Sequence, residues 1–166
     1  LHPLKQPAKT PATRLHAQTS PDFANKLAQT QALMQSAARD FSPLKQASSL
    51  GAEDMVITHL LSETGIACSV FVLDTGLLHA QTLALIGRIE ERYARPVLVF
   101  SPQAEAASAF VSAHGDQAMY ESVELRKQCC GIRKMEPLAR ALAGQKAWIT
   151  GLRREQSAAR AEVPAI

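Results

Sequence analysis

The chain has 166 residues, of which 46% are apolar and 20% are charged; this balance is typical of a folded globular domain and excludes a wholly disordered chain or a coiled coil. No apolar run approaches the roughly 20 residues that a membrane-spanning helix needs. Residues 126–160 hold nine of the 18 basic residues and two of the 15 acidic ones, which predicts a local anion site rather than a surface for nucleic acid.

The N-terminal residues 1–20 contain proline and lysine but no acidic residue, and no apolar core follows them. A secretory signal is therefore not expected. We predict a disordered tail over these residues, with a transit peptide as the alternative. Ser20-Pro21-Asp22 then indicates the start of a helix, with a capping side chain before a proline. Residues 21–166 are predicted to form one domain.

Strands and helices alternate along this domain. β-Branched and aromatic residues make Cys68–Leu73 a buried strand, whereas apolar spacing makes Leu78–Tyr93 a helix. The predicted strands are Leu44–Ser48, Cys68–Leu73, Val97–Phe100 and Ala147–Thr150. The predicted helices are Pro21–Arg39, Ala52–Glu63, Leu78–Tyr93, Pro102–His114 with Ala106, Ala109, Phe110 and Ala113 inward, Glu121–Cys130 and Met135–Ala143.

This alternation predicts an α/β fold with crossover connections, which means a doubly wound, mostly parallel sheet with helices on both faces. Such sheets bind ligands beyond the carboxyl ends of their strands. The residues that directly follow each strand are therefore the candidates for a binding site.

Small and polar residues follow the first strand, in Ser48, Ser49, Leu50 and Gly51. They allow the backbone to approach a ligand closely, and the next helix directs its free N–H groups and dipole toward the same place. The segment is predicted to be an anion-binding loop. An ordinary strand-to-helix turn capped by Ser49 is an equally good interpretation.

An acidic turn, Asp74, Thr75 and Gly76, follows the second strand. Asp74 could accept a hydrogen bond from a ribose hydroxyl or an adenine amine, although capping of the next helix is the commoner role. After the last strand come Arg153 and Arg154, with Arg160 just beyond. Guanidinium groups suit phosphate or sulfate oxygens, and the alternative is a solvated run of charge.

The three cysteines do not form a disulfide framework, because their number is odd and two of them are adjacent. A reducing, cytoplasmic location is expected. Cys68 is predicted to be a core residue. Cys129 and Cys130 lie among the basic residues of segment 126–134, which would stabilise thiolates or an anionic iron–sulfur centre; a vicinal disulfide or no special role are the alternatives.

Four motifs in this order resemble those of the assimilatory adenylyl-sulfate and phosphoadenylyl-sulfate reductases. They are SSLGAEDMV at Ser48–Val56, LDTG with a following LH at Leu73–His79, RKQCCGIRKMEPL at Arg126–Leu138, and AWITGLRREQS at Ala147–Ser157, with Arg160 beyond. The resemblance implies a fold like that of the ATP pyrophosphatases, the adenine nucleotide alpha hydrolase-like fold. The cysteine pair resembles the mark of the family's iron–sulfur branch.

The resemblance also implies roles for individual residues. Ser48, Ser49, Leu50 and Gly51 would line the phosphosulfate side, and Asp74, Thr75 and Gly76 would lie against the nucleoside. Lys134 would link the cluster's surroundings to the substrate anion, beside an arginine loop of Arg153, Arg154 and Arg160. Cys129 and Cys130 would supply two of the four ligands to a 4Fe–4S cluster.

The implied reaction is thioredoxin-dependent reduction of adenosine 5′-phosphosulfate to sulfite and AMP. Its nucleophilic cysteine is expected beyond Ile166, so no catalytic residue is assigned within the chain, which we expect to be a C-terminally incomplete, nucleotide-binding fragment that is inactive alone. The alternatives are a 3′-phosphoadenylyl-sulfate reductase and an adenine-nucleotide-binding module without redox activity. The implied partners are adenosine 5′-phosphosulfate, AMP and thioredoxin or a similar dithiol. A homo-oligomer is compatible with the sequence, and neither nucleic acid nor a membrane is expected.

Overall fold

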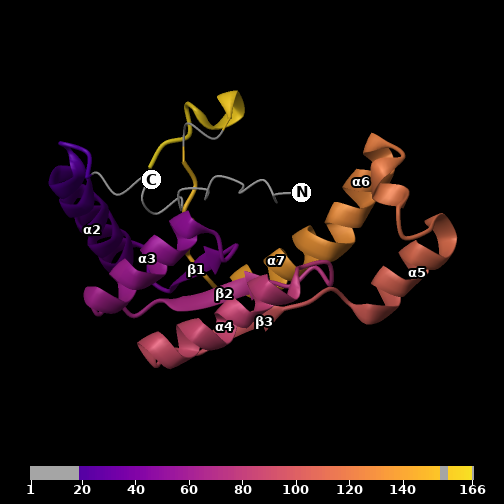
Figure 1. Cartoon of the computed structure of the whole chain (residues 1–166), viewed down its shortest axis with the longest axis horizontal. Helices are drawn as coiled ribbons and strands as arrows, with labels where there is room; N and C mark the ends of the chain where they lie inside the picture. The colour runs from indigo at the N-terminus through magenta and orange to yellow at the C-terminus, as the bar shows by residue number, and fades with distance from the viewer. Residues whose placement is uncertain (1–18, 154–156, 166) are drawn as a thin grey trace, which may run out of the picture.

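The computed structural model describes residues 19–153 and 157–165 (Figure 1). The predicted tail therefore lies almost wholly outside the described residues. In chain order the elements are α2 (Phe23–Asp40), β1 (Leu44–Ser48), α3 (Ala52–Glu63), β2 (Ser69–Leu73), α4 (Ala80–Tyr93), β3 (Val97–Phe100), α5 (Ala104–His114), the 3-10 turn η1 (Ala118–Tyr120), α6 (Val123–Cys130), the π-helical turn η2 (Gly131–Met135), α7 (Glu136–Leu142), β4 (Ala147–Ile149) and the 3-10 turn η4 (Ala158–Arg160).

The four strands form one parallel sheet in the order β3-β2-β1-β4, which confirms the predicted fold class. Helices α3 and α4 pack on one face and α7 contacts the other, so the sheet is doubly wound (Figure 1). The strand order reverses between β1 and β4, because the connections after β1 and β2 run toward one edge and the return runs to the other. Such a switch point is where open α/β sheets bind ligands.

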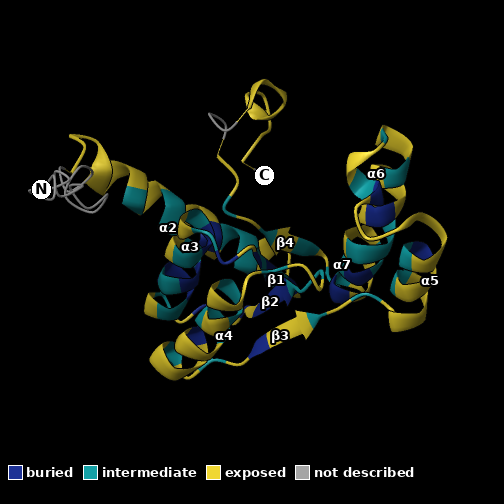
Figure 2. Ribbon diagram, turned by 45° about the vertical axis from the view of Figure 1, so that its right-hand side comes forward, coloured by how far each residue is buried: buried dark blue, intermediate teal, exposed yellow. Residues whose placement is uncertain are grey.

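Three apolar clusters hold the elements together. The first joins α2 and α3 to β1 through residues such as Met34, Leu44 and Leu61. The second joins α4 to β2 and β3, with Ile89 against Val70. The third lies apart from the sheet, under α5 and α6, which stand together in Figures 1 and 2. Among the described residues, no helix has the length and apolarity that crossing a membrane requires.

The segment that carries the cysteine pair differs from the sequence-based expectation of two separate helices. Here α6, η2 and α7 follow one another without a break. Pro137 lacks an N–H group and its ring would crowd the carbonyl group of Arg133, four residues earlier, in a regular α-helix. The wider π-helical turn that precedes Pro137 avoids this crowding, and such turns are frequent at functional sites.

Two local expectations were wrong. The N-cap of α2 is Asp22, which makes no side-chain capping bond, while Ser20 accepts from the Phe23 N–H through its backbone carbonyl (2.9 Å). On α5 only Phe110 of the predicted inward face is buried. The reason is that α5 packs against η1, α6 and η2 through a narrow contact, and not broadly against the sheet.

Candidate functional site

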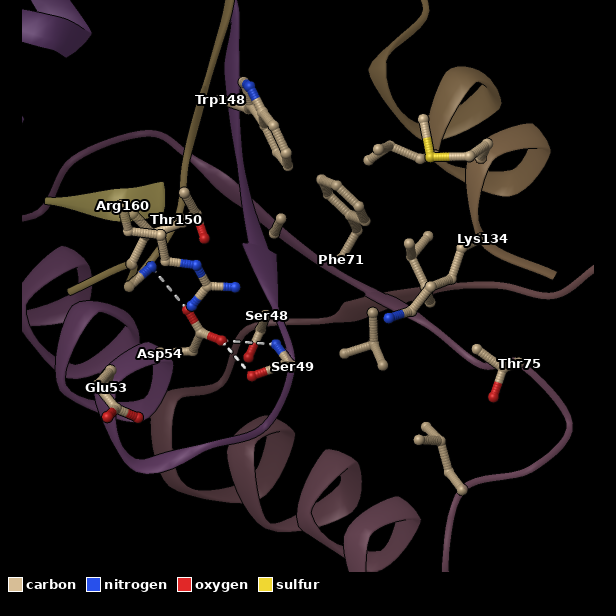
Figure 3. Close-up of a pocket in the computed structure, with 18 residues that line it drawn as sticks. Ser48, Ser49, Glu53, Asp54, Phe71, Thr75, Lys134, Trp148, Thr150 and Arg160 are labelled. Atoms are coloured by element: carbon tan, nitrogen blue, oxygen red, sulfur yellow. Dashed lines mark hydrogen bonds between the residues drawn. The ribbon is translucent and has the colours of Figure 1, made fainter. Parts of the chain in front are cut away.

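A cavity of about 490 Å³ opens at the carboxyl ends of β1, β2 and β4, at the switch point of the sheet. All four sequence motifs contribute to its lining (Figure 3). Five of the predicted site residues line it, namely Ser48, Ser49, Thr75, Lys134 and Arg160. Parallel strands thus bring together residues that lie more than 100 positions apart in the sequence.

Other predicted site residues do not line the cavity themselves but lie next to residues that do. Leu50 has its side chain buried in the α4 cluster, so only its backbone can serve the loop. Gly51, Asp74, Gly76 and Arg153 flank the lining residues without joining them. Arg154 lies outside the described residues.

The loop after β1 owes its shape to a positive φ and to serine hydroxyl groups. Leu50 has φ +62°, and its N–H donates to Ser48 Oγ (3.1 Å). The N-cap of α3 is Gly51, and no side chain caps the N-terminus of this helix. The interpretation of Ser49 as a helix cap is therefore wrong, because Ser49 Oγ instead donates to Asp54 Oδ2 (2.6 Å).

Asp54 is the central residue that the sequence analysis missed. Its carboxylate is only 6% exposed and accepts the Ser49 N–H (2.7 Å) and Ser49 Oγ through Oδ2. Through Oδ1 it accepts the N–H of Gly151 (2.8 Å), 97 residues away. One buried carboxylate therefore joins the loops that follow β1 and β4 (Figure 3).

Gly151 must approach Asp54 closely for this contact. A Cβ atom at position 151 would lie 2.7 Å from Asp54 Oδ1 and 2.8 Å from the Asp54 backbone nitrogen. Both distances are below van der Waals contact, so only glycine fits without a shift of the backbone. In the sequence, Asp54 and Gly151 read as an acid in a first helical turn and a strand terminator, and neither signal points to the other.

The turn after β2 is supported mainly from within. Asp74 Oδ1 accepts the Gly76 N–H (2.9 Å), and Thr75 Oγ1 accepts the Leu77 N–H (3.3 Å). The Asp74 N–H donates to the Phe100 carbonyl at the end of β3 (3.0 Å). The N-cap of α4 is His79, so the expectation that Asp74 caps this helix was wrong; Asp74 closes its own turn.

Two cations enter the cavity from different sides. Figure 3 shows Arg160 directed into it beside Asp54, and Lys134 directed into it from η2. Arg153 instead pairs with Glu53 at 2.8 Å, with side chains 57% and 33% exposed. The predicted positive charge is thus divided between side chains that line the cavity and one that is held at its rim.

Apart from Glu53 and Thr150, the remaining lining is apolar. Phe71 from β2 lies at the bottom, with Leu138 from α7 and Trp148 from β4 beside it. Trp148 is 47% exposed, and its indole lies near the Phe71 ring (Figure 3). The sequence analysis gave Trp148 no part in a binding site; its position on β4 places it at the cavity.

The cysteines occupy different environments. Burial raises the pKa of the Cys68 thiol to about 11, which keeps it protonated and confirms its core position. Cys129 is buried with Phe110 and Ala118, whereas Cys130 is exposed. Within the described ranges, no three His, Cys, Asp or Glu side chains are placed to share a metal ion, so a cluster at the pair requires ligands from outside those ranges.

Comparison with known proteins identifies relatives of this chain. A family model described as the phosphoadenosine phosphosulfate reductase domain matches residues 43–166. An adenosine 5′-phosphosulfate reductase from Burkholderia cepacia is 49% identical over 144 residues, 87% of this chain and 58% of the relative. One from Neisseria meningitidis serogroup A is 55% identical over 119 residues, 71% of this chain and 49% of the relative.

A solved structure shows the same fold. It is the phosphoadenylyl-sulfate reductase from Candida auris in complex with phosphate, with a TM-score of 0.62 and 25% identity over 81% of this chain and 69% of the other. The chain spans about half the length of the curated relatives it matches. With 124 consecutive residues inside the family model, the chain belongs to the phosphoadenosine phosphosulfate reductase domain family.

Proposed function

We propose that this protein reduces adenosine 5′-phosphosulfate to sulfite and AMP. The observation that supports this best is the cavity at the switch point, where Lys134 and Arg160 meet the loop Ser48–Gly51. Several relatives at 43–55% identity carry the name of an adenosine 5′-phosphosulfate reductase. A volume near 490 Å³ is within the usual range for a small-molecule site.

The lining suggests how such a substrate would lie. Its anionic end would face Lys134 and Arg160, because charge-assisted hydrogen bonds to oxyanions are the strongest that side chains offer. Its nucleoside would lie toward Thr75 and the apolar bottom formed by Phe71 and Trp148. Arg153 would join the anion site once its pairing with Glu53 is given up.

The proposed chemistry is transfer of the sulfonyl group to a cysteine thiolate, which is expected from outside the described residues. The thiolate attacks the sulfate sulfur, the bond between sulfur and the phosphate oxygen breaks, and AMP leaves. The resulting S-sulfocysteine is then cleaved by a dithiol such as thioredoxin, which is oxidised to a disulfide and releases sulfite. Lys134 and Arg160 would stabilise the charge that grows on the leaving phosphate.

We also propose that Cys129 and Cys130 supply two ligands to a 4Fe–4S cluster in the reducing cytoplasm. The end of α6 suits this role, because Cys130 is exposed and the basic side chains of segment 126–134 offset thiolate charge. When bound, the cluster would add a polarisable, net-anionic centre near Lys134. The other two ligands are expected from outside the described residues.

Titration calorimetry of the full-length protein with adenosine 5′-phosphosulfate and AMP tests the binding site. Lys134→Ala should weaken both by roughly 10- to 150-fold, since it removes a charge-assisted contact of about 1.5–3 kcal/mol. Lys26→Ala is the matched control, because Lys26 is exposed on α2 and does not line the cavity. Failure of the unmodified protein to bind either nucleotide at millimolar concentration would refute the proposal.

A second candidate substrate, 3′-phosphoadenylyl sulfate, is favoured by the name of the Candida auris structure. Competition of the two nucleotides for the same protein separates the candidates. We expect the form without the 3′-phosphate to bind at least tenfold more tightly. The reverse preference would assign the alternative substrate to this protein.

Iron content and visible absorption test the cluster. The full-length protein should contain about four irons, by analogy with clusters held by four cysteines, and Cys129→Ser or Cys130→Ser should remove them. Cys68→Ala is the control and should retain the iron, because Cys68 is packed in the apolar core that joins α2 and α3 to β1. Retention of the iron in the double serine variant would exclude these ligands.

A further inference from the structure

The residue next to Lys134 makes a contact that the proposed function does not use. Arg133 Nη1 donates a hydrogen bond to the carbonyl oxygen of Thr75 at 2.7 Å, across 58 residues of sequence. The contact is partly buried. A Cβ atom built on Gly76 would lie 3.3 Å from the same nitrogen, so the guanidinium group lies directly against the turn after β2.

This contact connects the turn after β2 to a distant part of the described chain. The side chains of Asp74 and Thr75 bond within the turn itself, and these local bonds fix its shape but not its position. The Asp74 N–H ties the start of the turn to β3. Arg133 ties its middle to the helical segment on the other side of the cavity.

The π-helical turn supplies both residues of this arrangement. Arg133 and Lys134 are consecutive residues of η2, yet Arg133 reaches Thr75 while Lys134 lines the cavity. Thr75 lines the same cavity (Figure 3). Arg133 therefore sets the spacing between one wall of the cavity and the ammonium group that enters from the other.

We propose that Arg133 is a positioning residue that holds the Asp74–Gly76 turn at the distance from Lys134 that nucleoside binding requires. Its effect on a ligand runs through the turn and not through direct contact with an anion. The inference rests on the proposed function, since it presumes an adenine nucleotide in this cavity. Arginine suits the task because its charged, planar guanidinium makes a strong hydrogen bond to a carbonyl oxygen in a fixed direction.

The test compares adenosine with AMP in titration calorimetry of the full-length protein. Arg133→Ala should weaken the binding of both ligands by the same factor, roughly tenfold for one lost hydrogen bond from a charged donor. Arg133→Lys should restore part of the affinity, since an ammonium group can still donate to the Thr75 carbonyl. Arg88→Ala is the matched control: it removes the same charge from an exposed position on helix α4, and Arg88 does not line the cavity.

Amide hydrogen exchange gives a second, local measurement. Exchange should become faster in Arg133→Ala for residues 74–77, and it should stay unchanged in the loop 48–51, which Arg133 does not contact. If the alanine variant does not fold, Arg133→Met serves in its place, because methionine keeps a long unbranched side chain but has no donor for the Thr75 carbonyl.

The outcomes separate the inference from the proposed function. Equal weakening for adenosine and AMP, with local exchange at the turn, supports positioning. Weakening for AMP alone would show a direct anion contact and would overturn the inference, as would unchanged binding of both ligands to Arg133→Ala. An unmodified protein that binds neither ligand would overturn the proposed function together with the inference.

Discussion

The two walls of the cavity are held in different ways. On the side of β1 and β4, the Asp54 carboxylate accepts three hydrogen bonds and joins two loops in a buried position. On the side of β2, the turn Asp74–Gly76 closes on itself and is tied to its surroundings by Phe100 and Arg133. The first wall is fixed by a buried carboxylate, whereas the second is placed by single contacts, of which the one from Arg133 is partly buried.

This difference indicates how the site divides its work. A buried carboxylate that accepts three hydrogen bonds is costly to rearrange, because breaking them would leave its oxygens buried without donors. A surface turn held by single bonds can shift at small cost. We therefore expect the wall formed at β1 and β4 to be preformed and the turn Asp74–Gly76 to adjust when a ligand binds.

The largest effect is expected from removal of the buried carboxylate. Asp54→Ala leaves the N–H groups of Ser49 and Gly151 without their acceptor, which should lower the free energy of unfolding by about 3 kcal/mol. Urea denaturation followed by circular dichroism measures it. Asp116→Ala is the control, because Asp116 is exposed between α5 and η1. Equal stability of the two variants would contradict the preformed wall.

A smaller loss is expected from crowding the same contact. Gly151→Ala places a methyl group 2.7 Å from Asp54 Oδ1, and such overpacking costs about 1–3 kcal/mol. The control is the same substitution at Gly87 within α4, where, apart from its chain neighbours and the backbone of its own helix, no atom of the described residues lies within 4 Å of the added carbon. Gly87→Ala should raise the free energy of unfolding by about 0.5–1 kcal/mol, through higher helix propensity. Thermal unfolding of both variants measures these two changes in stability, which should have opposite signs.

On the other wall, Asp74→Ala removes the acceptor for the Gly76 N–H. Because this turn is near the surface, water can replace the lost acceptor, and we expect a loss of about 1 kcal/mol. Asp74→Asn keeps an oxygen in the same place and should remain within about 0.5 kcal/mol of the unmodified protein. A loss as large as that of Asp54→Ala would remove the proposed distinction between the walls.

The smallest change in stability is expected at the residue next to Asp54. Glu53 pairs with Arg153 near the surface, and such pairs contribute little, so Glu53→Gln should change the free energy of unfolding by less than about 0.5 kcal/mol. The affinity of this variant for AMP should rise about two- to fivefold, because the substitution neutralises a carboxylate beside the proposed anion site. Calorimetry checks it, and unchanged or weaker AMP binding would show that Arg153 does not serve the anion site.

The order and type of the elements could be predicted from the sequence alone. Alternating runs such as Val97–Phe100 and Leu78–Tyr93 indicated their own conformation, and β3 and α4 form there with at most a shift at the ends. The rule that parallel strands bind ligands at their carboxyl ends then placed Ser48 and Thr75 near one another. Both line one cavity together with Lys134, whose role was implied by the family resemblance. These predictions follow from local periodicity and from chain topology, both of which can be inferred from a single sequence.

The contacts that hold the site together depended on the tertiary structure. Asp54 and Gly151 are 97 residues apart, and Arg133 and Thr75 are 58 apart. The local sequence around each of these residues does not indicate which distant residue it contacts. The burial of Leu50 and the continuity of α6, η2 and α7 likewise depend on what packs nearby. The sequence by itself determined which residues could bind an anion and at which end of the sheet. Which of them enter the cavity, and which only hold its walls, was decided by tertiary packing, because a side chain's role as ligand contact or support depends on the partner that reaches it through space.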